Sequence, residues 1–199
     1  MNKYKYAIEI GGSNTKIFVK DSGFALCEPT LVTAEPTPTG YKIVGYGKKA
    51  KQMLGKTNDS VEVFSPVSDG KIINYEYLKV LLTYFFSLLN FKKKRDSIIV
   101  LTNCGTSKSE KDKMLSLFYE LGFKEVVLLP KVICSLLGAG KNISSMKTNM
   151  IVNIGGANTD IAVVNNNSIV KGATLGIGGR AVDVAIANTI AYNHGLVVG

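Results

Sequence analysis

The sequence is poor in the residues that build metal centres and hydrolytic triads. It contains a single histidine, His194, and three widely separated cysteines with no C-x-x-C pair, Cys27, Cys104 and Cys134. One histidine gives little basis for a histidine-rich metal centre or a Ser–His–Asp triad. The scattered cysteines predict reduced, partly buried thiols in a cytosolic protein rather than a disulfide framework.

Long apolar segments are also missing. The first ten residues, MNKYKYAIEI, have no extended apolar core and carry Glu9 within them, so they do not resemble a secretion signal. No uninterrupted apolar stretch reaches the roughly eighteen residues that a membrane-spanning helix needs. We therefore expect a soluble or peripheral protein.

Positive charge, by contrast, is abundant. The 199 residues include 24 Lys and Arg against 15 Asp and Glu, a net charge of +9, and 46% of them are hydrophobic, which is enough for a globular core. A basic balance favours partners that carry phosphate, whether a nucleotide, a nucleic acid or an anionic lipid. Exposed lysines that merely keep the chain soluble explain the charge equally well.

The order of the expected elements indicates the fold class. Alternating apolar residues and turn signals predict strands through most of residues 5–72, with a short helix at 48–56. From residue 74 onward, helices at 74–90 and 109–123 alternate with short apolar strands, and Ser109 and Gly122 are the expected ends of the second helix. This order predicts a mixed α/β sheet with helices packed on it.

One twelve-residue pattern occurs twice. IEIGGSNTKIFV (8–19) and VNIGGANTDIAV (152–163) share seven identical positions, and each places a Gly-Gly turn between apolar strands. Such a turn exposes backbone N–H groups that can wrap a phosphate, and the hydroxyls of Ser13, Thr15 and Thr159 would add donors. Two facing turns would clamp a diphosphate or triphosphate, whereas the alternative is a pair of ordinary tight turns. The clamp would consist of Gly11, Gly12, Ser13, Asn14, Thr15, Gly155, Gly156, Ala157, Asn158 and Thr159.

The repeated hairpins resemble the two phosphate-binding hairpins of the superfamily that contains actin, the DnaK-type chaperones and the sugar kinases. Within it, the chain is similar to the MreB family of bacterial actins over essentially its whole length. The segments that carry the resemblance follow one another in register: CEPTLVTAE, VGYGKKAKQMLGKT, PVSDGKIINYE, KEVVLLPKVICSLLGAGKN and LGIGGRAVDVAI.

The resemblance implies an actin-like, ribonuclease H-like α/β fold that binds ATP with Mg²⁺. It implies a first domain at residues 1–148 with the N-terminal phosphate hairpin, and the beginning of a second domain at 149–199 with the second hairpin. Proteins of this family continue through a small subdomain and a loop that holds adenosine. We therefore expect a C-terminally truncated form, either a fragment or a half-length protein with poor nucleotide affinity.

Three positions depart from the family pattern. Where the family has aspartates that hold the water shell of Mg²⁺, this sequence has Glu9 and Asn153, and where it has a glutamate that positions the attacking water, this sequence has Lys131. A longer carboxylate disturbs the metal geometry, an amide loses a charge, and an ammonium group cannot accept a proton. These catalytic and water-mediated metal positions predict at most a weak ATPase, with hydrolysis slow or lost.

The end of the helix at 74–90 runs into a basic segment, LLNFKKKR. In the MreB family a hydrophobic loop at this place inserts into the membrane, which implies that apolar side chains enter the lipid while the cations meet lipid phosphates. Those residues are Leu88, Leu89, Phe91, Lys92, Lys93, Lys94 and Arg95. The alternative is an ordinary helix end, with the apolar side chains in the core and the lysines facing the helix dipole.

The resemblance thus implies a cell-shape protein of the bacterial cytoskeleton, a nucleotide-binding filament or scaffold subunit. It would be cytoplasmic, peripheral on the inner face of the cell membrane, self-associating or assembled with other MreB-like subunits, and without a nucleic-acid partner. The alternative is a non-enzymatic, actin-like adaptor that binds filament subunits without nucleotide. A sugar kinase of the ROK family is less favoured, because its Glu-x-Gly-His stretch and its Cys-rich zinc motif are absent from the sequence.

Overall fold

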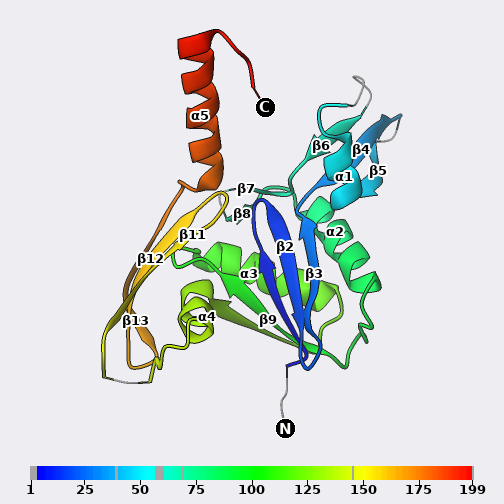
Figure 1. Ribbon diagram of the computed structural model, residues 1–199. Coiled ribbons are helices and arrows are strands. Elements are labelled where there is room, and N and C mark those ends of the chain that lie inside the picture. Colours follow the sequence, from blue (N-terminus) through cyan, green and yellow to red (C-terminus); the bar gives the residue numbers. More distant parts are fainter. Residues whose placement is uncertain (1–3, 39, 57–60, 69, 145, 199) are drawn as a thin grey trace. The chain divides into compact units, whose positions relative to one another are not determined.

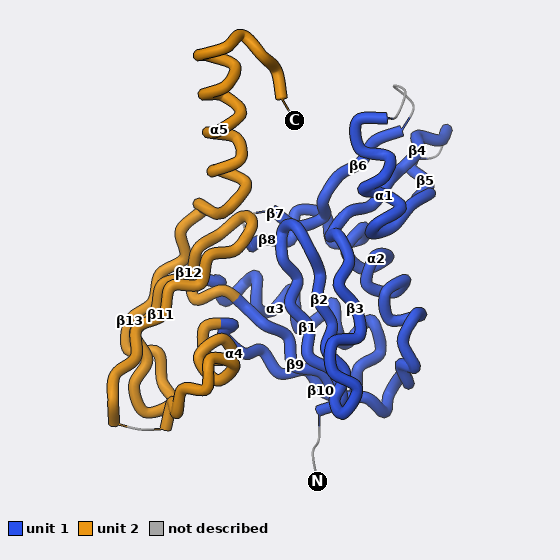
Figure 2. Tube along the Cα trace, in the orientation of Figure 1, with its two compact units in different colours: residues 1–102, 106–131 blue, residues 103–105, 132–199 orange. Residues whose placement is uncertain are grey.

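The computed structural model describes residues 4–38, 40–56, 61–68, 70–144 and 146–198 (Figure 1). The chain forms two compact units, one comprising residues 1–102 and 106–131 and the other comprising residues 103–105 and 132–199 (Figure 2). The predicted domain boundary lay after residue 148. The division between compact units falls after residue 131, so that the helix at 131–138 belongs almost entirely to the second unit.

The first unit is built on a five-stranded mixed sheet with the strand order β10-β9-β1-β2-β3. β1, β2 and β3 form an antiparallel meander, while β9 lies parallel to β1 and β10 lies parallel to β9. This arrangement confirms the predicted mixed α/β sheet with flanking helices. The strands are β1 (Tyr6–Ile10), β2 (Asn14–Val19), β3 (Gly23–Pro29), β9 (Ser97–Thr102) and β10 (Glu125–Pro130).

Two amphipathic helices, α2 (Tyr75–Ser87) and α3 (Lys108–Glu120), supply apolar side chains to the core of this sheet. Phe85 from α2 and Phe118 from α3 are fully buried there. The predicted N-cap of α3 was wrong, since Ser107 rather than Ser109 accepts a hydrogen bond from the Glu110 N–H. Ser107 is followed three residues later by Glu110, which is the spacing of a capping box. This spacing favours Ser107 over Ser109 as the N-cap.

A smaller group of elements completes the first unit. β4 lies between β5 and β6 in a three-stranded antiparallel sheet, and β7 and β8 pair in a separate two-stranded ribbon. The elements are β4 (Val32–Thr37), β5 (Gly40–Tyr46), α1 (Lys48–Met53), β6 (Glu62–Phe64), β7 (Val67–Ser68) and β8 (Lys71–Ile72).

The second unit contains an antiparallel three-stranded sheet in the order β11-β12-β13. β12 buries Asp160, Ala162 and Val164 on one of its faces, whereas every residue of the last helix, α5, is at least partly exposed. Of the described helices, none is both long enough and apolar enough to cross a membrane. The elements are α4 (Lys131–Gly138), β11 (Asn149–Ile154), β12 (Thr159–Asn165), β13 (Ser168–Leu175) and α5 (Gly179–His194).

Candidate functional site

The two copies of the repeat form turns that are closed in the same way. In the first unit, the N–H of Gly11 donates to the carbonyl oxygen of Asn14 at 3.0 Å, between β1 and β2. In the second unit, the N–H of Gly155 donates to the carbonyl oxygen of Asn158 at 2.8 Å, between β11 and β12. The similarity in sequence is therefore also a similarity in hydrogen bonding.

Space requires glycine at the first position of the first turn and favours glycine at the same position of the second. A Cβ added at Gly11 would lie 2.7 Å from the Asn14 carbonyl oxygen, and one added at Gly155 would lie 3.0 Å from the Asn158 carbonyl oxygen. These are the same oxygen atoms that the two glycine N–H groups bind. Any larger residue at either position therefore has to push its own hydrogen-bond acceptor away.

The tips of both turns offer backbone N–H groups. Within the described part of the chain, no hydrogen bond uses the N–H of Gly12 or Ser13 in the first turn, or that of Gly156 or Ala157 in the second. Successive N–H groups in a turn form a concave site that favours an anion. Each turn is by itself an arrangement that suits a phosphate oxygen.

The threonine hydroxyls of the two turns serve the protein itself. Thr15 is fully buried, and its hydroxyl lies 3.0 Å from that of Thr30. Because the Thr30 hydroxyl donates to the Gly11 carbonyl oxygen at 2.6 Å, the Thr15 hydroxyl donates to Thr30. The Thr159 hydroxyl donates to the Ile177 carbonyl oxygen at 2.7 Å. Of the three hydroxyls expected to bind phosphate, that of Ser13 is thus the one left for this role. The other donors to phosphate are backbone N–H groups.

The second turn is supported by the beginning of α5. The N–H groups of Gly179 and Arg180 donate to the carbonyl oxygens of Gly155 and Gly156, both at 2.9 Å. Gly178 packs so closely that an added Cβ would lie 2.5 Å from the Gly155 oxygen. The carbonyl oxygens of Gly155 and Gly156 therefore already have hydrogen-bond donors within the protein. The N–H groups of Gly156 and Ala157 are the groups of this turn that remain for a ligand.

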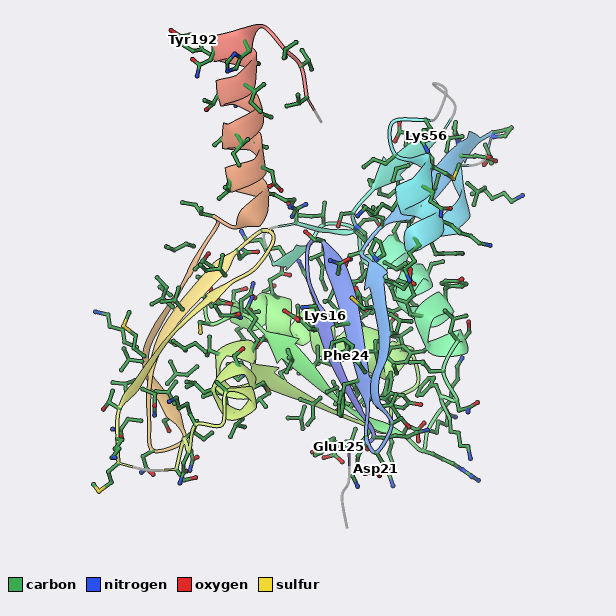
Figure 3. The ribbon with its side chains drawn as sticks, in the orientation of Figure 1. Lys16, Asp21, Phe24, Lys56, Glu125 and Tyr192 are labelled. Atoms are coloured by element: carbon green, nitrogen blue, oxygen red, sulfur yellow. The ribbon has the colours of Figure 1, made fainter. Side chains whose placement is uncertain are left out.

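Two of the three substituted positions lie at the base of the turns. Glu9 is opposite Lys16 on the neighbouring strand, and their side chains form an ion pair at 3.1 Å; Figure 3 labels Lys16 on β2. Asn153 occupies the matching place on β11, opposite Asp160. Lys131 is the first residue of α4, directly after β10. Among the described residues, no group of three or more His, Cys, Asp or Glu side chains forms a metal site.

Asp160 is a residue whose role the sequence analysis missed. Its side chain is fully buried, and Oδ1 accepts hydrogen bonds from the Cys104 N–H at 3.1 Å and from the Thr174 hydroxyl at 2.5 Å. The carboxylate thereby joins β12 to β13 and to residues 103–105. The available signal was the alternation of β12, which places Asp160 on the same face as the buried Ala162 and Val164.

The apolar and basic segment after α2 divides into an inner and an outer part. Phe91 stacks on Phe123 with ring centroids 4.3 Å apart, and Leu89 also packs against the core. Leu88 is 56% exposed, and the four cations from Lys92 to Arg95 are exposed as well. Of the three apolar side chains assigned to the membrane, Leu88 alone therefore faces outward.

Comparisons with known proteins agree on one family. A family model described as MreB/Mbl protein matches residues 3–199. The chain is 30% identical over 198 residues to the cell shape-determining protein MreB of Escherichia coli K12, covering 97% of this chain and 57% of that protein. It is 30% identical over 196 residues to the cell shape-determining protein Mbl of Bacillus subtilis, covering 96% of this chain and 58% of that protein.

Solved structures give the same result for the fold. The crystal structure of MreB5 of Spiroplasma citri bound to AMPPNP matches with a TM-score of 0.90 and 25% identity, over 98% of this chain and 58% of that one. The ADP-bound structure of the same protein matches with a TM-score of 0.89, also at 25% identity, over all of this chain and 60% of that one. The chain thus spans a little over half the length of the relatives that it matches.

Proposed function

This chain belongs to the MreB/Mbl family of bacterial actins, and from that premise we propose that it acts as a nucleotide-binding subunit of a cell-shape-determining scaffold. The subunit self-associates into filaments or assembles with other MreB-like subunits at the inner face of the cell membrane. The observation that carries the proposal is the pair of turns, each closed by a Gly-to-Asn hydrogen bond and each with N–H groups at its tip that no hydrogen bond among the described residues uses.

ATP with Mg²⁺ is the proposed ligand. The N–H groups of Gly12 and Ser13 bind one part of the polyphosphate, and those of Gly156 and Ala157 bind another. The crystal structures of the Spiroplasma citri relative bound to AMPPNP and to ADP support this choice of ligand. Mg²⁺ keeps most of its waters and binds through the phosphates, so a single nearby carboxylate such as Glu9 suffices on the protein side. Asn153 would contact the same water shell as a neutral group.

The chemistry of these positions favours binding over hydrolysis. Bound Mg²⁺ would neutralise charge that develops on the phosphates, but turnover also needs a group that orients and deprotonates water. Lys131 offers only donors while it is charged. The protein is therefore proposed to hold ATP and to turn it over slowly or not at all.

Restoring the residue types of the family at these three positions should restore hydrolysis. We expect the variant Glu9→Asp, Lys131→Glu, Asn153→Asp to release phosphate from ATP at least roughly tenfold faster than the wild-type chain, because it regains a water-positioning base and the metal shell. Steady-state phosphate release with saturating Mg·ATP measures this. The single variant Lys131→Gln removes the charge without adding a base and should show no gain. Equal rates for the wild type and the triple variant would contradict the assignment.

Contact with the membrane surface is assigned to Leu88 and the cations Lys92, Lys93, Lys94 and Arg95. Among the described residues, no ion pair involves these four cations. Each cation near an anionic surface contributes on the order of 1 kcal/mol. Leu88 is the exposed apolar side chain beside them. Together they suit a peripheral attachment to anionic lipid.

Self-association is supported by apolar surface on the second unit. On β11, Met150, Val152 and Ile154 alternate along one face and are 67%, 51% and 71% exposed. Along α5, apolar side chains project into solvent as far as Tyr192, which Figure 3 labels near the end of the helix. Exposed apolar side chains in this number favour a protein contact.

A second candidate is the adaptor that binds filament subunits without nucleotide. The observation in its favour is that the hydroxyls of Thr15 and Thr159 are engaged within the protein. Sedimentation separates the two proposals. A nucleotide-dependent subunit pellets more with Mg·AMPPNP than without nucleotide, whereas an adaptor that self-associates pellets equally under both conditions.

A further inference from the structure

A cavity of about 380 Å³ opens at the surface of the first unit, between the C-terminal ends of α2 and α3. Its apolar lining comes from Phe86, Leu89, Phe91 and Leu121. Phe86 and Phe91 belong to one aromatic cluster, with ring centroids 5.4 Å apart. The volume lies within the range of about 300–1,000 Å³ that is usual for small-molecule sites.

The rim of the cavity is polar and carries an excess of positive charge. Lys79 and Glu120 form an ion pair at 2.7 Å, and the Tyr75 hydroxyl donates to the same carboxylate at 3.0 Å. The bond to Glu120 raises the pKa of Lys79, and the bond from Lys79 lowers the pKa of Glu120, so both are charged at neutral pH. Lys93 is the remaining charged lining residue, and it has no ion-pair partner among the described residues.

Lys93 also connects the cavity to the basic segment. Its stem lies against Gly122, where an added Cβ would be 3.1 Å from the Lys93 Cγ, and Gly122 has a positive φ of 99° that favours glycine. Lys92, Lys94 and Arg95 are its exposed neighbours. One of four consecutive exposed cations therefore lines a pocket that is partly apolar.

We propose that this cavity receives an acyl chain of an anionic lipid, whose phosphate is held by Lys93 and the neighbouring cations. The inference rests on the proposed attachment to the membrane and states how that attachment is made. A hydrophobic loop that enters the bilayer has to point its apolar side chains outward, but Leu89 and Phe91 line the cavity and pack against the core of the unit. The lipid chain enters the protein instead, and Leu88 alone enters the lipid.

The positive charge at the rim and the apolar side chains of the cavity together favour an anionic lipid as the ligand. Phe86, Leu89, Phe91 and Leu121 give the cavity an apolar surface that a purely ionic ligand would leave uncovered, although Thr83, Ser87 and the charged rim supply hydrogen-bonding groups. The adjacent cations favour an anionic head group over a zwitterionic one. A single lipid molecule carries both an apolar chain and an anionic phosphate.

Filling the cavity tests the inference. Thr83 is an exposed residue of α2 that lines the cavity, and Thr83→Phe places a ring in it without changing charge. Ser116→Phe, on the exposed surface of α3 outside this cavity, is the matched control. Dihexanoyl phosphatidylglycerol below its micelle concentration is the probe, titrated by calorimetry. We expect binding at least about tenfold weaker in Thr83→Phe and unchanged in Ser116→Phe, since only the first occupies the site.

Two further titrations separate the possible outcomes. Inorganic phosphate should bind far more weakly than the short-chain lipid, and equal binding would show that the apolar lining plays no part. Equal lipid binding by the wild type and Thr83→Phe would overturn the inference. Should Thr83→Phe fail to fold, Ser87→Phe fills the same cavity from the next turn of α2.

Vesicle sedimentation tests the membrane attachment separately. Wild-type protein should pellet with vesicles of phosphatidylcholine and phosphatidylglycerol, and the variant Lys92→Gln, Lys94→Gln, Arg95→Gln should pellet much less. Absence of wild-type binding to vesicles would reject the attachment, while binding to the short-chain lipid would still support the cavity. If Thr83→Phe binds both vesicles and the short-chain lipid as the wild type does, the protein attaches to the membrane without using the cavity. The proposed lipid site in the cavity would then be wrong.

Discussion

Binding of Mg·ATP is expected to fall by at least about tenfold, roughly 1.4 kcal/mol, when either Gly11 or Gly155 is replaced by alanine. In both turns the added Cβ meets the carbonyl oxygen that the glycine N–H binds, at 2.7 Å in the first turn and 3.0 Å in the second. Relief of this contact has to move the Asn14 or Asn158 peptide. The N–H groups at the tip then shift relative to the phosphate that we propose they bind.

A matched control exists close to the second turn. Gly176 has open space around its added Cβ and no positive φ, so Gly176→Ala should leave Mg·ATP binding unchanged. Thermal unfolding of all three variants distinguishes a local change in the turn from a loss of fold. If Gly11→Ala and Gly155→Ala remain folded and bind nucleotide like the wild type, the turns are structural and do not hold phosphate.

The largest expected effect on stability comes from Asp160→Ala. The substitution removes the acceptor of the Cys104 N–H and the Thr174 hydroxyl, two donors that are partly buried. Hydrogen bonds to charged groups contribute about 1.5–3 kcal/mol each, so a loss on the order of 3 kcal/mol is expected in the free energy of unfolding. Because Asp160 is opposite Asn153 at the base of the second turn, this loss should also weaken nucleotide binding.

Asp160→Asn provides the comparison. The amide keeps an oxygen in the place of Oδ1, so it can accept the same two hydrogen bonds and should lose much less stability. Chemical denaturation followed by circular dichroism measures both variants. Equal stability of the wild type and Asp160→Ala would show that the buried carboxylate does not hold residues 103–105 to the sheet of the second unit.

Much of the candidate site was predictable because it is local in sequence. A Gly-Gly turn between apolar strands specifies a hairpin without help from distant residues, and both hairpins occur where the repeat places them. The end of α3 followed from Gly122, whose positive φ suits glycine. The mixed sheet followed from the order of strands and helices.

The rest depends on partners that lie far away in the sequence. The Thr15 hydroxyl is directed to Thr30 by the pairing of β2 with β3, and no local pattern contains that information. Phe91 turns inward because Phe123, from the segment after α3, provides a ring to stack on. The role of Asp160 likewise appears only when residues 103–105 pack against β12 and β13. Tertiary contacts therefore redirect side chains whose secondary structure was predictable.

Calorimetric titration of the wild-type chain with Mg·ATP, repeated with EDTA, tests the central claim most directly. We expect saturable binding that weakens when EDTA removes magnesium, because the turns hold the phosphates and the metal completes the charge balance. The absence of any heat of binding at high nucleotide concentration would contradict it. The repeated turns would then be scaffolding, and the adaptor that needs no nucleotide would be the better description.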